Sequence, residues 1–291
     1  MGRRFIFVGN RRFVLERMVA SGVNLSSIYV VAGTHLERDL RREGVPGVTD
    51  YVLVHNKSEL IHLLCQARFD VLISNGCPYI LPVADLPHAK YVNIHPSYLP
   101  DLRGVDPVIG AILFRRDSGA TCHVMDSGVD TGPIISRIRI PFKDDLDVTT
   151  LYQLSFVAEQ QVFSKALALG FEPQYEQLND PRAIYYCRKP ADQVISFRED
   201  NDFILQKIKA FNNHSQGCSF SIGGVSYRVF SAQRMCNPFI LKLLEGFPEC
   251  EVGMSYENGI VFRKDGEVLR FLEILSANGK AISVGTNLRQ P

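Results

Sequence analysis

Three side chains that could together carry an acyl-group transfer stand near one another in this sequence: an amide, an imidazole and a carboxylate. Asn93 and His95 lie in the run Asn-Ile-His-Pro-Ser, and Asp130 lies in the later run Asp-Ser-Gly-Val-Asp-Thr-Gly. An amide can donate to an oxyanion, an imidazole can accept a proton, and a carboxylate can orient the imidazole. We therefore take these residues as candidate catalytic groups for a transfer without a covalent intermediate.

The spacing of Asn93 and His95 suits a shared pocket. Residues two apart on a β-strand point to the same face, and Pro96 restricts the chain where this strand is expected to end. The alternative is a capping Asn beside a surface His.

The carboxylate is expected from the turn between Asp126 and Gly132. Gly128 and Gly132 permit close backbone approach there, and Asp130 is favoured over Asp126 because it lies deeper in the segment. Taken by itself, the same turn is also typical of a plain hairpin between two strands.

A loop with two prolines follows His95 and carries a cation. Ser97, Tyr98 and Arg103 are candidates for placing a substrate, and Arg103 could hold a phosphate or a carboxylate. A salt bridge from Arg103 to Asp101 or Asp106 is an equal alternative.

Two further loops are expected at the same edge of the fold. Arg11 follows the first predicted strand at the start of a helix, where anions often bind, although a solvated helix start is commoner. The apolar loop 75–82 could receive a flat ring, or could simply be packed. Cys77 within it is disfavoured as a nucleophile, because no basic neighbour in the sequence would lower its pKa.

The first part of the chain alternates short β-rich runs with helical patterns, which predicts a doubly wound, mostly parallel α/β sheet. Ligands bind such sheets beyond the carboxyl ends of the strands, where residues 75–78 and 93–96 fall. The predicted strands are 5–8, 28–32, 51–54, 71–74, 91–94, 120–125 and 133–140, and the predicted helices are 12–20, 36–43, 58–66 (with Ser58 as its cap) and 149–169.

The later part of the chain reads differently. A helix over 203–211 is followed by short segments separated by Gly-Gly, Asn-Gly and Asp-Gly turns, which predicts a small β-barrel or sandwich. We expect three regions: a catalytic domain over 1–182, a linker over 183–200 and a β-rich domain over 201–291.

Composition is that of a soluble globular protein of 291 residues, with a formal net charge of +1 that advertises no polyanionic partner. No apolar run is long enough to span a bilayer, and the N-terminus reads as a strand and not as a signal peptide. Seven scattered cysteines without a Cys-x-x-Cys pair indicate reduced thiols in the cytoplasm and no zinc site. The remaining histidines, His214 among them, lack metal-ligand spacing, and His123 is expected to be structural.

A longer pattern surrounds the candidate residues. It runs Asn93-x-His95-Pro96-Ser97-x-Leu99-Pro100-x-x-Arg103-Gly104-x-x-Pro107, and then Asp126-x-Gly128-x-Asp130-Thr131-Gly132-Pro133-Ile134-Ile135. This pattern resembles the formyltransferase family, whose members use N10-formyltetrahydrofolate and an Asn/His/Asp triad. The resemblance implies a Rossmann-like catalytic domain, a triad of Asn93, His95 and Asp130, and no metal. It also implies a folate site lined by Gly76, Cys77, Pro78, Ile80, Asp126 and Gly128.

The C-terminal part is similar to the small OB-like β-barrel of methionyl-tRNA formyltransferases and of some sugar formyltransferases. Tyr98 in the Pro-Ser-Tyr-Leu-Pro run is typical of the sugar-nucleotide enzymes. Residues 192–291 hold eleven Lys/Arg and eleven Asp/Glu, whereas a surface that follows tRNA should be basic.

We therefore expect a sugar-nucleotide N-formyltransferase, for which the resemblance suggests a setting such as O-antigen biosynthesis. A nucleic-acid acceptor and a membrane partner are disfavoured, and a homodimer is left open. Alternatives are a methionyl-tRNA formyltransferase, a formyltetrahydrofolate hydrolase with water as acceptor, and a catalytically silent nucleotide-sugar binding module.

Overall fold

The chain, described here from a computed structural model over residues 2–178, 180–213 and 216–289, forms two compact units. His214 lies outside the described residues. The first unit comprises residues 1–108, 117–142 and 152–187, and the second comprises 109–116, 143–151 and 188–291. Each unit is thus assembled from three separate stretches of sequence.

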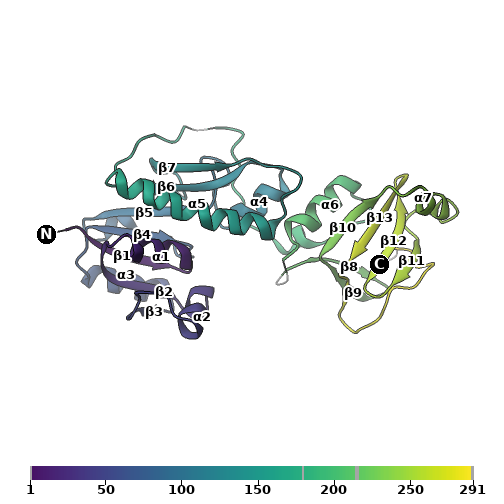
Figure 1. Cartoon of the computed structure of the whole chain (residues 1–291), viewed down its shortest axis with the longest axis horizontal. Helices are drawn as coiled ribbons and strands as arrows, with labels where there is room; N and C mark the ends of the chain where they lie inside the picture. Colours follow the sequence, from purple (N-terminus) through teal and green to yellow (C-terminus); the bar gives the residue numbers. More distant parts are fainter. Residues whose placement is uncertain (1, 179, 214–215, 290–291) are drawn as a thin grey trace. The chain divides into compact units, whose positions relative to one another are not determined.

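The first unit is built on a seven-stranded sheet in the order β3-β2-β1-β4-β5-β6-β7 (Figure 1). Strands β1 to β5 run parallel, while β6 and β7 are antiparallel to their neighbours, which confirms the predicted mostly parallel sheet. The strands are β1 Arg4–Gly9, β2 Asn24–Val31, β3 Val52–Val54, β4 Val71–Asn75, β5 Lys90–His95, β6 Ser118–Val124 and β7 Ile134–Ile140.

Apart from the helix over 107–113, the helices that alternate with these strands agree closely with the predicted ones. They are α1 Arg12–Ala20, α2 His35–Arg42, α3 Lys57–Gln66, α4 Pro107–Leu113 and α5 Val148–Ala168, with a 3₁₀ turn at Val83–Asp85. The prediction that Ser58 caps α3 is wrong. The helix begins one residue earlier, and Asn56 in extended backbone accepts a hydrogen bond from the Glu59 N–H at 2.9 Å.

Successive side chains of β1 point to opposite faces of the sheet and pack into two hydrophobic cores, one on each face. Phe5 and Phe7 pack into the core that includes α1 and α5 residues, whereas Ile6 and Val8 pack into the core that includes α3 residues. A strand covered on both faces has no polar side, which explains its continuous apolar sequence.

Strand β5 lies between β4 and β6 and carries the candidate residues at its carboxyl end. Asn93 pairs with Ser74 of β4 on one side and with His123 of β6 on the other. The turn that joins β6 to β7 holds Asp130. The sheet order therefore brings three chain segments to one place.

The second unit contains two antiparallel sheets, in the orders β10-β13-β12-β11 and β14-β9-β8. Its predicted β-rich character is confirmed, although within the described residues the strands form two separate ladders. The strands are β8 Cys218–Ile222, β9 Val225–Val229, β10 Ser231–Met235, β11 Val252–Tyr256, β12 Gly259–Lys264, β13 Glu267–Leu272 and β14 Leu275–Ser276; the helices are α6 Asn201–Ala210 and α7 Pro238–Leu244, with a 3₁₀ turn at Pro190–Gln193.

Aromatic side chains fill the centre of the second unit. The Phe197 ring lies 5.5 Å from that of Phe220 and 5.8 Å from that of Phe262, and the Phe262 and Phe271 rings meet edge to face at 5.0 Å. Glu273 adopts a left-handed φ of 54° between β13 and β14 and separates these two strands.

Candidate active site

The three candidate catalytic residues meet at the carboxyl end of β5. Asn93 Nδ2 donates to Asp130 Oδ1 at 3.2 Å, and His95 Nδ1 lies 3.5 Å from Asp130 Oδ2. Both side chains of β5 reach the same carboxylate, as their spacing on a strand predicted. The structure therefore excludes the alternative of a surface His, since His95 is 4% exposed.

The protonation pattern of His95 follows from its second contact. Its Nε2 lies 2.9 Å from the Leu102 carbonyl oxygen, which can only accept, so Nε2 carries the hydrogen in the neutral ring. The lone pair of Nδ1 then faces Asp130. Leu102, rather than Asp130, selects the tautomer, and a proton taken up by His95 would lie between Nδ1 and the carboxylate.

Burial and charge act in opposite directions on this pair. Burial lowers the pKa of His95, and the neighbouring Asp130 only partly offsets this effect. Burial by itself would raise the pKa of Asp130, but His95, His123 and the Gly104 N–H together lower it. The site thus holds a neutral imidazole beside an ionised carboxylate at neutral pH.

His123 is a fourth member of the cluster formed by Asn93, His95 and Asp130. From the sequence it was expected to be only structural. Its Nδ1 donates to the Val124 carbonyl at 2.9 Å, so Nε2 is left to accept from Asn93 Nδ2 at 3.3 Å. Nε2 also lies 3.5 Å from Asp130 Oδ1. The antiparallel pairing of β5 with β6 places His123 opposite Asn93, a signal that requires the register to be known.

The turn that carries Asp130 is held by short-range hydrogen bonds. Asp126 Oδ1 accepts from the Gly128 N–H at 3.0 Å and from the Thr131 hydroxyl at 2.6 Å, so Asp126 stabilises the turn itself. Asp130 has a left-handed φ of 54°, and the Gly104 N–H donates to its Oδ2 at 3.0 Å. At Gly132 an added Cβ would lie 1.9 Å from the Val124 carbonyl oxygen.

A largely apolar cavity of about 480 Å³ borders this turn. Asp126, alone among the predicted folate-site residues, lines it, and Ile80 is 65% exposed in the neighbouring loop. Burial raises the pKa of the Cys77 thiol to about 11, which agrees with its exclusion as a nucleophile. The lining residues are Val83, Ala84, His88, Ala89, Lys90, Tyr91, Val124, Met125, Asp126 and Ser127.

The predicted substrate-placing residues of the loop after β5 have different surroundings. Ser97 is fully buried and its hydroxyl donates to the Asp101 carbonyl at 2.8 Å. The Tyr98 ring stacks on the Arg137 guanidinium at 4.3 Å. Arg103 donates to Gln177 Oε1 at 2.9 Å and forms no ion pair with any described residue, so the alternative salt bridge is not formed.

Arg11 forms an ion pair with Glu159 of helix α5, whose carboxylate is fully buried. Asn75 Nδ2 donates to the other Glu159 oxygen at 3.2 Å, and the Arg11 guanidinium lies 5.4 Å from the Phe156 ring. Burial raises the pKa of Glu159, while Arg11 opposes that rise. Arg11 is therefore not a solvated helix start, and its charge is already engaged.

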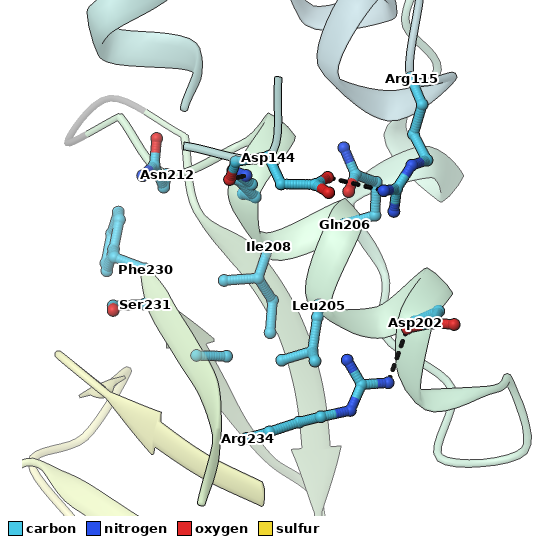
Figure 2. A pocket seen from close by; sticks show the side chains of 12 residues that line it. Arg115, Asp144, Asp202, Leu205, Gln206, Ile208, Asn212, Phe230, Ser231 and Arg234 are labelled. Atoms are coloured by element: carbon cyan, nitrogen blue, oxygen red, sulfur yellow. Dashed lines mark hydrogen bonds and ion pairs between the residues drawn. The ribbon is translucent and has the colours of Figure 1, made fainter. Parts of the chain in front are cut away.

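A second cavity, of about 450 Å³, lies within the second unit between α6 and β10 (Figure 2). Its charged groups face one another: Arg115 pairs with Asp144 and Arg234 with Asp202, each at 2.6 Å. Leu205 and Ile208 provide its apolar wall. No sequence motif indicated this cavity, and no nucleophile and base are in contact among its described lining residues.

No group of His, Cys, Asp and Glu side chains suited to a metal ion occurs in the described part of the chain. Among the same residues, no helix combines the length and the apolar character needed to cross a membrane.

Residues 52–167 match the sequence model of the formyl transferase family. This matching segment includes Asn93, His95 and Asp130.

The chain is 32% identical over 177 residues to a methionyl-tRNA formyltransferase of Nitrosospira multiformis, covering 58% of this chain and 56% of the relative. It is 31% identical over 161 residues, 52% of its length, to the trifunctional purine biosynthetic protein adenosine-3 of Drosophila melanogaster, of which it spans 12%. The chain thus spans about half or less of these two relatives.

The fold is similar to that of an N-formyltransferase from Helicobacter canadensis, solved with folinic acid and dTDP-3-aminofucose. The TM-score is 0.67 at 18% identity, and the likeness covers 94% of this chain and 99% of the other. The shared fold therefore extends beyond the segment that matches the family.

Proposed function

We propose that this protein transfers a formyl group from N10-formyltetrahydrofolate to the primary amine of a nucleotide-linked 3-amino- or 4-amino-dideoxy sugar. The observation that carries the proposal is the meeting of Asn93, His95 and Asp130 in a buried site at the carboxyl end of β5. An amide, a neutral imidazole and a carboxylate suit attack by an amine on a formyl carbon.

The chemistry follows from the atoms that face the site. The neutral amine forms a bond to the formyl carbon, and the carbonyl oxygen becomes an oxyanion that Asn93 Nδ2 stabilises. His95 Nδ1 takes the proton from the attacking nitrogen, and Asp130 stabilises the imidazolium. Collapse of the tetrahedral species breaks the bond to N10, which receives the proton held by His95 as tetrahydrofolate leaves.

The Asn93 amide is engaged before the substrate arrives. Its Nδ2 is within hydrogen-bond distance of both His123 and Asp130. An oxyanion must therefore replace one of these two groups as the acceptor of the Asn93 hydrogen bond. Asp130 is the partner to be exchanged, since His95 provides it with a new hydrogen bond once Nδ1 is protonated. Charge development at His95 would thus release the donor that the oxyanion needs.

The donor is proposed to occupy the cavity beside Tyr91 and Asp126. Its apolar lining suits a flat heterocycle, and its polar rim at the β6–β7 turn suits the ring's amide edge. Gly76, Cys77, Pro78, Ile80 and Gly128 do not line this cavity, so their proposed folate contacts lie outside it.

The acceptor is proposed from charge and from the loop after β5. The equal numbers of basic and acidic residues in 192–291 do not suit a polynucleotide surface. Arg103, which forms no ion pair within the described part of the chain, could hold a diphosphate. An OB-like barrel for the second unit remains part of this proposal.

A methionyl-tRNA formyltransferase is the second candidate, favoured by the name of the Nitrosospira relative. A panel of acceptors decides between them: thymidine- and uridine-linked 3-amino and 4-amino sugars, charged initiator tRNA, and no amine. We expect a mass gain of one formyl group on a sugar nucleotide. Formylation of the tRNA alone, or formate release without amine, would overturn the proposal in favour of the tRNA enzyme or a hydrolase.

A further inference from the structure

Gln177 lies in the segment that follows helix α5 and contacts both sides of the site. We infer that Gln177 is a positioning residue that ties the turn carrying Asp130 to the loop carrying Arg103. This inference rests on the proposed function for its catalytic consequence. Gln177 belongs to neither the motif nor the triad.

The amide of Gln177 is fully used. Its Nε2 donates to the Asp130 carbonyl at 3.0 Å and to the Gly132 carbonyl at 2.7 Å. Its Oε1 accepts from Arg103 Nη2 at 2.9 Å. A glutamine is required for this arrangement, because it offers two donor hydrogens and an acceptor from a single side chain.

Backbone pairing holds Gln177 in place. The Ile134 N–H donates to the Tyr175 carbonyl at 2.7 Å, and the Gln174 N–H donates to the Ile134 carbonyl at 2.8 Å. Further along, the Arg103 N–H donates to the Ile184 carbonyl at 3.1 Å. The chain after α5 is thus paired with the Asp130 side and with the Arg103 side.

The Asp130 turn needs such support. Its left-handed φ of 54° is sparsely populated for a residue with a side chain and persists only when its surroundings hold it. The Gly104 N–H fixes the carboxylate at 3.0 Å, and Gln177 fixes the two carbonyls around it. Together they set the 3.5 Å approach of Asp130 to His95.

Gln177 orients the Arg103 guanidinium without neutralising its positive charge. Gln177 Oε1 is a neutral acceptor, and Arg103 Nε is buried with no hydrogen-bond partner among the described residues. The guanidinium is therefore aligned while its charge stays available for an anionic acceptor. The Gln177 side chain therefore positions both Asp130, the partner of His95, and Arg103, the proposed phosphate contact.

The test uses Gln177→Met and Gln177→Glu, with Gln174→Met as matched control because the Gln174 side chain is exposed and donates only to the Glu172 carbonyl in the described structure. We expect kcat to fall about tenfold in both Gln177 variants. KM for the sugar nucleotide should rise more in Gln177→Glu, whose carboxylate neutralises Arg103, than in Gln177→Met. KM for the folate should stay unchanged.

A second readout does not depend on turnover. Amide hydrogen exchange across residues 128–134 should become about tenfold faster in Gln177→Met and remain at the wild-type rate in Gln174→Met. Wild-type kcat in both Gln177 variants, or unchanged exchange of the turn, would overturn the inference. A wild-type protein that formylates no amine would instead overturn the proposed function, and the exchange result would still decide the positioning of the turn.

Discussion

His95 Nδ1 is the atom on which the proposed chemistry depends, and its proton affinity can be measured directly. Burial lowers the pKa of His95 most, Asp130 and the Leu102 carbonyl raise it, and His123 and Arg11 lower it further. Because burial outweighs the carboxylate, we expect NMR titration of the ring C–H signals in substrate-free protein to place the His95 pKa below the ordinary value of about 6.5.

The same titration in Asp130→Asn should move the His95 pKa lower still, because the variant removes the negative charge that favours the imidazolium. His95→Gln identifies the signal. A wild-type midpoint above the ordinary value, or an upward shift in Asp130→Asn, would show that the balance of burial and charge described here is incorrect.

His123 is expected to act through Asn93. In His123→Phe the Asn93 amide loses one acceptor and becomes free to turn, so the oxyanion donor is less well aligned. We expect kcat to fall about tenfold, less than the ~10²–10³ typical of losing an oxyanion donor outright, with little change in KM for the folate. His123→Gln, which restores an acceptor, should recover part of the loss; equal activity of wild type and His123→Phe would exclude this part for His123.

At the scale of elements, strand β1 and helix α1 are tied to α5 by one buried ion pair. Arg11→Met would leave the fully buried Glu159 without its cation, so we expect the free energy of unfolding at pH 7 to fall by ~3–5 kcal/mol. Arg12→Met is the control on the same helix. Its partners Glu16 and Glu43 are partly exposed, and the loss there should be ~0.5 kcal/mol.

The direction in which the stability loss of Arg11→Met changes with pH tests whether the unpaired Glu159 carboxylate causes it. The folded-state pKa of Glu159 is raised, so its contribution to stability is present below the unfolded value of 4.5 and is lost as pH rises through the folded value. The deficit of Arg11→Met, measured by urea unfolding, should therefore shrink towards acidic pH. A deficit that grows on acidification would point to another origin.

Much of the first unit was accessible from sequence because local patterns and global packing agree there. The apolar runs of β1, β4 and β5 and the spacing in α1 coincide with the observed elements. Strand β10 was missed since Ser231–Met235 is mostly polar, and α7 was missed because Pro238–Leu244 is a short apolar run that periodicity cannot assign.

The site residues that share a strand or a turn were predicted from the sequence. Those that reach the site only through strand pairing or tertiary hydrogen bonds were missed. Asn93, His95 and Asp130 stand in recognisable runs. His123 requires the β5–β6 register, and Gln177 reaches the site through the chain after α5. Neither contact leaves a trace in spacing or composition.

At the scale of the whole molecule, the two units are interleaved in sequence, because the chain passes from one unit to the other several times. Residues 109–116 and 143–151 belong to the second unit, where the Gln206 amide donates to the Ile112 carbonyl and Asn212 donates to Asp147 at 3.1 Å. A chain ending at Cys187 would lack Gln206 and Asn212 and so lose both hydrogen bonds. We expect it to aggregate or to melt at a lower temperature than the full chain, as judged by light scattering and calorimetry; a truncated chain as stable and as monodisperse as the full chain would contradict this view.

The central claim is that one amide, one imidazole and one carboxylate act on a single formyl carbon. The most direct measurement is single-turnover transfer of labelled formyl from N10-formyltetrahydrofolate, with enzyme in excess, in wild type, Asn93→Ala, His95→Gln and Asp130→Asn. We expect all four proteins to bind the folate and each variant to transfer at least ~10² more slowly than wild type. Transfer by His95→Gln at the wild-type rate would contradict it.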